Sequence, residues 1–222
     1  MQAYEFINNL IPPLKPKDKS KMALSWMEEI RTNMLPVVEN NRFVGFVTDD
    51  LIYTLNNPEL HVSKIALESS ACFVYQDKHI YDVIKVASEY HSIMVAVIDR
   101  ENNYLGVVTM EDAIGAFADS LSIQSHGAVL VLSMFMTDYS LFDIARIVES
   151  ENTKILSSFI SNDPLDDSKI KVTLKLDKAE LRHIKATLER FGYRIIDHYQ
   201  EEEESGNGEQ ERIDNLLRFL QI

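Results

Sequence analysis

Hydrophobic and polar positions in the first half of the chain follow two periods, and each period predicts one kind of element. Apolar residues at helical spacing predict helices over 3–10, 19–31, 49–55, 80–90 and 110–121. Short apolar runs bounded by turn residues predict strands over 35–39, 42–47, 71–75, 93–98 and 104–108. Pro12, Pro13 and Pro16 predict an extended segment before the second helix, because proline fixes φ and disfavours helix in the residue before it. The pattern therefore predicts two successive units, each with the order strand, helix, strand, strand, helix.

These two units are copies of one another. Residues 43–52 consist of an apolar pair, a glycine, an apolar pair, a threonine, an acid and an apolar helix start, and residues 104–114 repeat this order. Gly45 matches Gly106 and Thr48 matches Thr109, both at an offset of 61 (106 − 45 and 109 − 48). A three-stranded unit leaves one apolar face exposed, so we expect the two copies to pack against each other.

The pattern changes after Gly127. Apolar and alternating runs predict strands over 128–135, 154–161, 169–176 and 193–199, with helices over 140–150 and 178–191. Gly192 follows the second helix as its C-cap. The order strand, helix, strand, strand, helix, strand is that of the ferredoxin-like arrangement. We therefore predict an α+β protein with a repeat pair over 1–121 (the first repeat about 1–57, the second about 62–121) and a ferredoxin-like domain over 127–199.

The last segment, residues 200–222, has a different composition. It carries seven acids and two bases, and its Gly206-Asn207-Gly208 stretch is typical of a solvated linker. Apolar residues at positions 213, 216, 217 and 220 predict a short amphipathic helix after this acidic linker. Because a helix of this length is marginal alone, we expect it to dock on its own body or on a second subunit.

Composition and charge narrow the classes of function. Acids outnumber bases by 35 to 22, and the net charge of −13 argues against nucleic acid, whose binding is dominated by lysine and arginine on phosphates. A small anionic ligand stays open, since exposed charges are screened beyond about 8 Å at physiological salt. No apolar run approaches the roughly 20 residues that span a bilayer, and no basic region precedes an apolar run at the N-terminus. With Cys72 as the one cysteine, we expect a buried, inert thiol and a soluble, cytoplasmic protein.

Catalysis finds no support in the residue pattern. The histidines show no metal-ligand spacing; they lie at positions 61, 79, 91, 126, 183 and 198. Adjacent carboxylates such as Glu111 and Asp112 point apart on a helix, and no Gly-rich phosphate loop exists among the seven glycines. Nothing pairs a nucleophile with a base. We therefore expect a protein that is not an enzyme and that holds no metal and no cofactor beyond a regulatory ligand.

The paired units, each preceded by strand, turn and strand, resemble a pair of CBS repeats, the so-called Bateman module. The first copy also contains the stretch Leu35-Pro36-Val37-Val38-Glu39, which is similar to the Pro-Val-Val-Asp signature of that family. The order of elements over 127–199 resembles an ACT domain. A CBS pair followed by an ACT-like domain is similar to the arrangement in AcuB-like, acetoin-utilisation-related proteins.

The resemblance implies a regulatory protein. CBS pairs bind adenosine nucleotides such as AMP, ADP or ATP, or S-adenosylmethionine, in clefts between the repeats and report occupancy to an attached domain. The family pattern places an aspartate three residues after the serine or threonine, where it takes the ribose hydroxyls, and Thr109 with Asp112 matches this spacing. In the first copy Thr48 is followed by Asp49 and Asp50, one residue short, so this copy departs from the pattern.

The residues themselves support two interpretations of the Thr-x-x-Asp spacing. A hydroxyl at a strand-to-helix junction lies beside unpaired backbone N–H groups and the positive end of the helix dipole, which suits a phosphate. A carboxylate one turn further can accept two hydrogen bonds from vicinal hydroxyls. The same spacing is also a capping box, which satisfies the helix without any ligand. Arg31 and His91 lie at matched helix ends, where each either meets a phosphate or is solvated.

The second domain has two expected roles. ACT domains usually bind amino acids at a Gly-containing turn after the first strand, and the corresponding turn here, residues 137–141, has no glycine. A close backbone approach to a ligand normally needs one, which favours dimerisation over amino-acid sensing. We therefore predict a regulatory homodimer whose CBS pair binds an adenosine nucleotide. The alternatives are a ligand-free dimerising scaffold and amino-acid sensing by the ACT-like domain. The predicted nucleotide-binding residues are Thr109, Asp112, Thr48, Asp50, Arg31 and His91.

Overall fold

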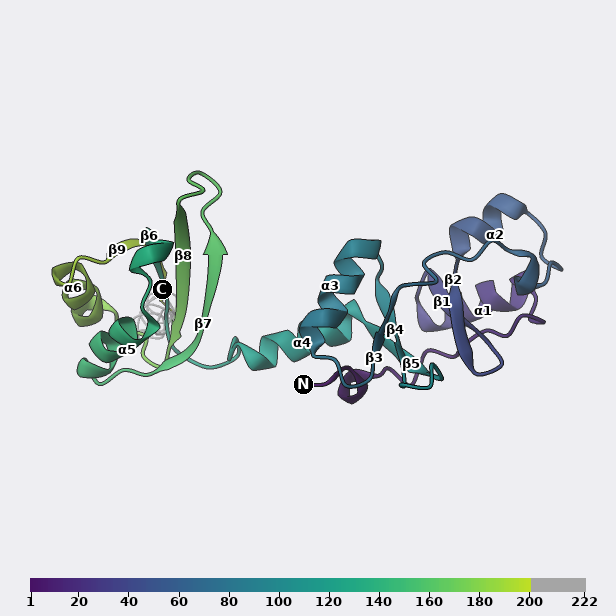
Figure 1. The fold of residues 1–222 in the computed structure, drawn as a ribbon, viewed down its shortest axis with the longest axis horizontal. Coiled ribbons are helices and arrows are strands. Elements are labelled where there is room, and N and C mark those ends of the chain that lie inside the picture. The colour runs from purple at the N-terminus through teal and green to yellow at the C-terminus, as the bar shows by residue number, and fades with distance from the viewer. Residues whose placement is uncertain (201–222) are drawn as a thin grey trace, which may run out of the picture. The chain divides into compact units, whose positions relative to one another are not determined.

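The computed structural model describes residues 1–200 and divides the chain into two compact units, residues 1–117 and the residues from Ala118 onward (Figure 1). Each unit contains both helices and sheets, which confirms the mixed α+β class. The amphipathic helix predicted near the C-terminus lies outside the described residues.

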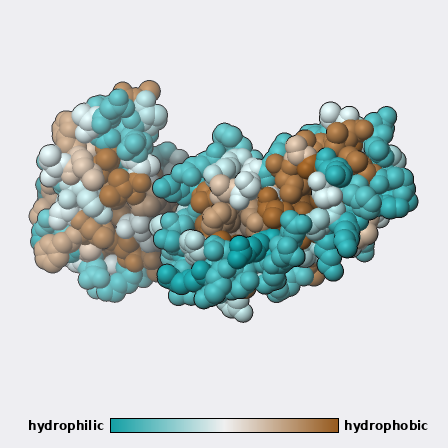
Figure 2. Space-filling view, turned by 45° about the vertical axis from the view of Figure 1, so that its right-hand side comes forward, coloured by the Kyte–Doolittle hydropathy of each residue, from teal (hydrophilic) through white to brown (hydrophobic). Residues whose placement is uncertain are grey.

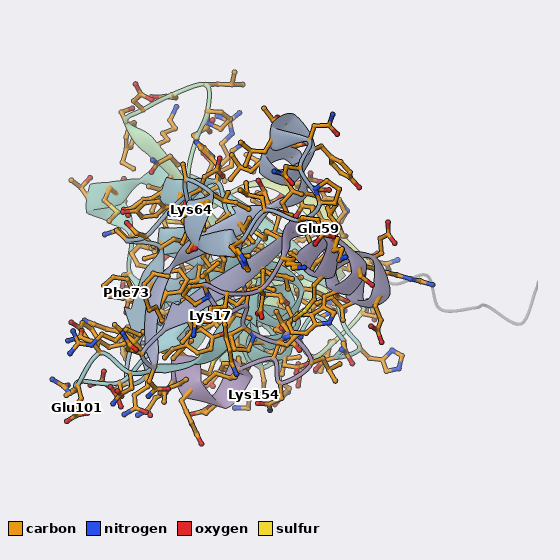
Figure 3. The ribbon with its side chains drawn as sticks, turned by 90° about the vertical axis from the view of Figure 1, so that its right-hand side faces the viewer. Lys17, Glu59, Lys64, Phe73, Glu101 and Lys154 are labelled. Atoms are coloured by element: carbon orange, nitrogen blue, oxygen red, sulfur yellow. The ribbon has the colours of Figure 1, made fainter. Side chains whose placement is uncertain are left out.

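The elements of the first unit follow the predicted order closely. They are the 3-10 helix η1 (Ala3–Phe6), α1 (Ser20–Ile30), β1 (Met34–Glu39), β2 (Arg42–Thr48), α2 (Asp49–Leu55), the 3-10 helix η2 (Val62–Lys64), β3 (Phe73–Tyr75), α3 (Ile80–Tyr90), β4 (Met94–Ile98), β5 (Tyr104–Thr109) and α4 (Met110–Ser120). Strands β1 and β2 pair antiparallel. Strand β3 is parallel to β4, which is antiparallel to β5. The turn that joins β4 to β5 contains Glu101, which is labelled in Figure 3.

The expected first strand of the first repeat is reduced to one bridge. Leu14 pairs in parallel with Val37, at the place where Val74 pairs with Val97 in the second repeat. The Leu14 N–H donates to the Pro36 carbonyl at 2.8 Å, and the Val38 N–H donates to the Leu14 carbonyl at 2.8 Å. The prolines on both sides of Leu14 have no N–H to donate, so the pairing cannot extend.

The N-terminal helix is also shorter than predicted. Only Ala3–Phe6 is helical, and Asn8 pairs with Val107 on β5, its N–H donating to the Val107 carbonyl at 2.8 Å. The correction has a physical reason, because Ala3 is fully buried in the core of the second repeat and the following residues continue along the edge of its sheet. The equivalent segment before the second repeat runs along the sheet of the first repeat, since Glu68 pairs with Phe46 on β2. Each repeat is therefore completed by the segment that precedes the other.

The repeated glycines lie where these crossing segments meet the strands. A Cβ atom on Gly106 would lie 2.4 Å from Cγ2 of Ile7. A Cβ atom on Gly45 would lie 2.9 Å from the carbonyl oxygen of Glu68, and Gly45 also has a φ of +142°, which L residues rarely adopt. The glycine that recurs in both copies therefore leaves room for the crossing segment, through the Ile7 side chain at Gly106 and through the Glu68 backbone at Gly45.

The second unit contains β6 (Val129–Phe135), the 3-10 helix η3 (Met136–Asp138), α5 (Leu141–Ser150), β7 (Ile155–Asn162), β8 (Lys169–Leu176), α6 (Arg182–Arg190) and β9 (Arg194–Tyr199). Its four strands form one antiparallel sheet in the order β7-β8-β6-β9. Alternate residues of β8, from Ile170 to Leu176, are buried in one core with residues of both helices. Helix α6 begins at Arg182, four residues later than predicted, and the preceding chain is anchored at Asp177, which exchanges hydrogen bonds with Lys154.

Candidate functional site

Thr109 and Asp112 form a closed pair at the junction of β5 and α4. The Asp112 N–H donates to Thr109 Oγ1 at 3.1 Å, and Thr109 Oγ1 donates to Asp112 Oδ2 at 2.5 Å. The Thr109 N–H also donates to Asp112 Oδ2, at 3.3 Å. These reciprocal bonds are those of a capping box, in which the threonine satisfies one N–H of the first helical turn. The predicted pair is therefore brought together, and it is also satisfied internally.

A third donor reaches the same oxygen from a distant part of the chain. Asn8 Nδ2 donates to Asp112 Oδ2 at 3.1 Å. Asn8 is itself fixed, because its Oδ1 accepts the Leu10 N–H at 2.9 Å. Among the described residues, Oδ1 of Asp112 has no donor, and the Asp112 side chain is half-buried. The carboxylate therefore presents one occupied and one open oxygen.

The surroundings of the Asp112 carboxylate include the positive end of a helix dipole and one exposed acid. Met110 to Ser120 forms a helix of 11 residues, so the positive end of its dipole lies beside Thr109. In its first turn the Met110 N–H donates to the Ile93 carbonyl at 2.9 Å and the Asp112 N–H to Thr109 Oγ1. Glu111 in the same turn is exposed, so its charge is largely screened by solvent. The arrangement offers a hydrogen-bond acceptor at Asp112 Oδ1 and a positive dipole end at the start of α4.

The first copy builds a different junction. Thr48 caps α2 by accepting the Leu51 N–H at 3.4 Å. Leu51 occupies the place of Asp112, at the repeat offset of 61 (112 − 51). Asp50 is exposed, and its N–H donates to Asp49 Oδ1 at 2.8 Å. Among the described hydrogen bonds, Asp49 and Asp50 therefore make none with the Thr48 side chain.

Arg31 and His91 have a backbone role at the ends of α1 and α3. Both are C-caps in the left-handed conformation, with φ of 55° and 50°. Both are exposed, and the described part of the chain gives neither side chain a hydrogen bond or ion pair with Thr109 or Asp112. The structure thus assembles Thr109 and Asp112 and adds Asn8. Sequence reasoning missed Asn8 because it placed this residue inside a helix.

Two cavities of moderate size lie away from this pair. In the first unit, a cavity of about 520 Å³ is lined by residues 13–18 without Leu14, by residues 38–41 and by Tyr104; Lys17 on its rim is labelled in Figure 3. In the second unit, a cavity of about 420 Å³ lies among the ends of β6, β8 and α6. None of the six predicted nucleotide-binding residues lines either cavity.

The Tyr104 hydroxyl is the one buried side-chain nitrogen or oxygen atom among the described residues that has no hydrogen-bond partner. Burial raises the pKa of the Tyr104 phenol. The Tyr104 ring stacks on Phe43 with the centroids 6.4 Å apart. The residue therefore joins the two repeats by packing, at the cost of an unsatisfied hydroxyl.

Residues 1–200 contain no group of three or more histidine, cysteine, aspartate or glutamate side chains placed to hold a metal ion. None of their helices combines the length and the apolar character that crossing a membrane requires.

Comparison with known proteins identifies a domain in the second repeat. The CBS domain family matches residues 64–119. A CBS domain pair/ACT domain protein from Thermotoga maritima is similar in structure, with 21% identity over 55% of this chain and 99% of that chain and a TM-score of 0.50. The CBS domains of a transcriptional regulator from Streptococcus pneumoniae share 22% identity over 52% and 98% of the two chains, with a TM-score of 0.48. CBSX2, a CBS-pair protein from Arabidopsis thaliana that has been solved in complex with AMP, shares 18% identity over 53% and 96%, with a TM-score of 0.46. Residues 64–119 therefore contain a CBS domain, and the structural neighbours are CBS-pair proteins.

Proposed function

We propose that this chain is a non-catalytic regulatory protein whose first unit, a pair of CBS repeats, binds an adenosine nucleotide at the Thr109–Asp112 junction. The observation that carries the proposal is the half-buried Asp112 carboxylate with one open oxygen beside the start of α4, inside the matched CBS domain. The duplicated framework supports the pairing, because each repeat is completed by the segment that precedes the other.

The proposed binding follows from the charges and donors of the junction. The open Oδ1 of Asp112 accepts a sugar hydroxyl in a charge-assisted hydrogen bond, which is about twice as strong as a neutral one. The Glu111 N–H and the positive end of the α4 dipole stabilise a phosphate, since the Met110 and Asp112 N–H groups already donate to the Ile93 carbonyl and to Thr109 Oγ1. A neutral nucleoside would gain the first interaction without the second.

The first copy is proposed as a weaker site. Thr48 and Asp50 lie at its junction, but Asp50 is exposed and Leu51 stands in the place of the ribose-binding aspartate. Arg31 and His91 supply cationic or hydrogen-bonding groups only if their exposed side chains turn toward a bound phosphate. We therefore assign the principal site to the second copy.

The second unit is proposed to be an ACT-like domain of the ferredoxin-like type. Its element order with the split strand order β7-β8-β6-β9 supports this assignment. The turn after β6 contains Met136–Asp138 in a 3-10 helix and has no glycine, which favours dimerisation as its role.

One observation favours a second candidate function for this unit. The cavity of about 420 Å³ is lined by Lys169, Arg194 and Asp138, so charges of both signs meet at one apolar-walled site. This combination suits the carboxylate and ammonium groups of a free amino acid. Amino-acid sensing by the second unit is therefore kept as the alternative.

The proposed dimer has two candidate contacts, the second unit and the helices of the first unit, and exposed apolar residues favour the first-unit helices. Tyr53 on α2 and Ile114 on α4 occupy the same repeat position (114 − 53 = 61) and are 60% and 69% exposed. Tyr81 on α3 is 59% exposed as well. Apolar side chains at the surface are visible in Figure 2. Large apolar residues at matched positions suit a symmetric contact between two copies. A cytoplasmic location is part of the same proposal and is supported by the single cysteine, Cys72, which is buried and forms no disulfide within the chain.

A thermal-shift screen of the whole chain tests the proposed function. The probes are AMP, ADP, ATP, S-adenosylmethionine, NAD and the twenty amino acids, each at a concentration well above its expected dissociation constant. A ligand at 100 times its dissociation constant stabilises the native state by about 2.7 kcal/mol, which is a shift of several degrees. A shift with adenosine compounds alone supports the proposal. A shift with an amino acid alone supports the alternative, and no shift with any probe favours the ligand-free scaffold.

A further inference from the structure

The Asp112 carboxylate is not equally available to both hydroxyls of a ribose. Its Oδ2 already accepts three hydrogen bonds, two from Thr109 and one from Asn8, while Oδ1 has no donor among the described residues. A carboxylate oxygen offers about two lone-pair sites, so Oδ2 has no capacity left for a fourth donor. A single sugar hydroxyl finds an acceptor without a donor at Oδ1, but a second, vicinal hydroxyl needs Oδ2.

The three donors on Oδ2 differ in how readily a ligand can displace them. The two bonds from Thr109 are local, three residues away, and belong to the cap of α4. The bond from Asn8 comes from a residue 104 positions earlier in the chain and serves no helix cap. The amide of Asn8 is therefore the donor that a second hydroxyl would displace at the lowest cost to the fold.

We propose that Asn8 sets the sugar selectivity of this site, because its side-chain amide holds the carboxylate oxygen that the second hydroxyl of a ribose requires. This inference rests on the proposed binding of an adenosine nucleotide at Asp112. In the native chain, a ribonucleotide must exchange the Asn8 amide for its second hydroxyl, so it gains little over a deoxyribonucleotide. Without the amide, the same hydroxyl adds a charge-assisted hydrogen bond with nothing to displace.

A substitution of Asn8 can remove the side-chain amide without disturbing the backbone of its segment. The backbone pairing of Asn8 with Val107 does not involve the side chain. A serine at this position can still accept the Leu10 N–H that Asn8 Oδ1 accepts now, since serine hydroxyls make the same local turn contact. Its shorter side chain cannot span the distance to Asp112. Asn8→Ser therefore removes the amide while keeping the local turn, and the exposed neighbour Asn9 provides the matched control Asn9→Ser.

Calorimetric titration of the whole chain with AMP and with 2′-deoxy-AMP tests the inference. For Asn8→Ser we expect AMP to bind about tenfold more tightly than to the native chain, with 2′-deoxy-AMP nearly unchanged, because one charge-assisted hydrogen bond contributes roughly this factor. Asn9→Ser should leave the affinities for both nucleotides unchanged. Melting curves of both variants establish that each is folded at the titration temperature.

The outcomes separate the inference from the function on which it rests. If Asn8→Ser leaves the ratio of the two affinities unchanged or weakens AMP while Asp112→Ala weakens AMP at least tenfold, the inference is wrong and the proposed function stands. If AMP binds Asn8→Ser but not the native chain, the inference is supported in its strongest form. If neither nucleotide binds any of these proteins, both the inference and the proposed function are overturned.

Discussion

Ile7 lies against Gly106 so closely that a Cβ atom on the glycine would be 2.4 Å from Cγ2 of the isoleucine. The two residues belong to opposite ends of the first unit, and their contact locks the N-terminal segment onto β5. In the first repeat, Gly45 has the corresponding relationship with the backbone of Glu68. The repeated glycine thus explains why the two copies are interleaved rather than merely adjacent.

Substituting these glycines should destabilise the first unit to different degrees. Gly106→Ala meets the Cγ2 methyl of the β-branched Ile7, so we expect a loss of about 1–3 kcal/mol in the free energy of unfolding. Gly45→Ala meets a backbone carbonyl and also requires a φ of +142°, so we expect about 2–4 kcal/mol. Urea unfolding measures both losses.

The exposed Gly115 in α4 provides the control, since a Cβ atom there has no neighbour within 4 Å. Gly115→Ala should stabilise the chain by about 0.5–1 kcal/mol through helix propensity. Combining Ile7→Ala with Gly106→Ala should cost less than the sum of the single changes. Additive losses would show that the two residues do not compete for one space.

Tyr104→Phe should stabilise the protein. The change removes a buried hydroxyl that has no partner among the described residues, and such a group costs about 1–3 kcal/mol. Burial raises the pKa of this phenol in the folded state above the unfolded pKa of about 10. Below about pH 10 the phenol is protonated in both states, so the free energy of unfolding does not depend on its titration. As the pH rises above about 10, the phenol ionises more readily in the unfolded state and the free energy of unfolding falls. Thermal unfolding between pH 7 and pH 11 should therefore show a steeper alkaline loss in the native chain than in Tyr104→Phe. The exposed Tyr4 supplies the control Tyr4→Phe, and an equal effect of both changes would contradict this explanation.

The thiol of Cys72 should be unreactive in the folded protein. Cys72 is fully buried, its Sγ lies 3.6 Å from the Met94 carbonyl oxygen, and burial raises the pKa of the thiol. Because the thiolate is the reactive form, an aromatic disulfide reagent at pH 8 should modify Cys72 only at the rate at which the core opens. Adding urea through the unfolding transition should expose one thiol per chain. Complete modification within seconds in native buffer would show that this part of the core is open.

The matched exposed residues predict where two copies meet. Ile114→Glu places a charge on α4 and should shift the sedimentation coefficient from that of a dimer to that of a monomer at tens of micromolar, since desolvating an unpaired carboxylate in an interface is costly. Leu165, which is 92% exposed on the β7–β8 turn, supplies the control Leu165→Glu. A native chain that sediments as a monomer would refute the dimer, and a dimer that survives Ile114→Glu would refute this interface.

Much of the fold follows from local pattern. Helix α3 and strand β8 begin and end at the predicted residues, because a long periodic stretch bounded by turns is compatible with one kind of element and one set of boundaries. The errors lie where pairing between distant segments decides the structure. The predicted N-terminal helix yields to the pairing of Asn8 with Val107, and Leu14 forms one bridge where a strand was expected.

The candidate site was predictable only in part, for the same reason. Thr109 and Asp112 lie three residues apart, so their hydrogen bonds are local and the capping-box spacing predicts them. The contact of Asn8 with Asp112 depends on the path of a segment 104 residues earlier, and no local pattern specifies that path. The C-cap conformation of Arg31 and His91 was not anticipated, because nonglycine residues seldom occupy the left-handed region.

The most direct test of the central claim is the AMP affinity of Asp112→Ala, measured by calorimetric titration beside the native chain. The control is Asp119→Ala, which removes the same charge from an exposed position on the same helix. Losing charge-assisted hydrogen bonds worth about 1.5–3 kcal/mol should weaken AMP roughly 10- to 150-fold in Asp112→Ala, while Asp119→Ala binds as the native chain does. Equal AMP affinity in all three proteins would contradict the assignment of the nucleotide to the Thr109–Asp112 junction.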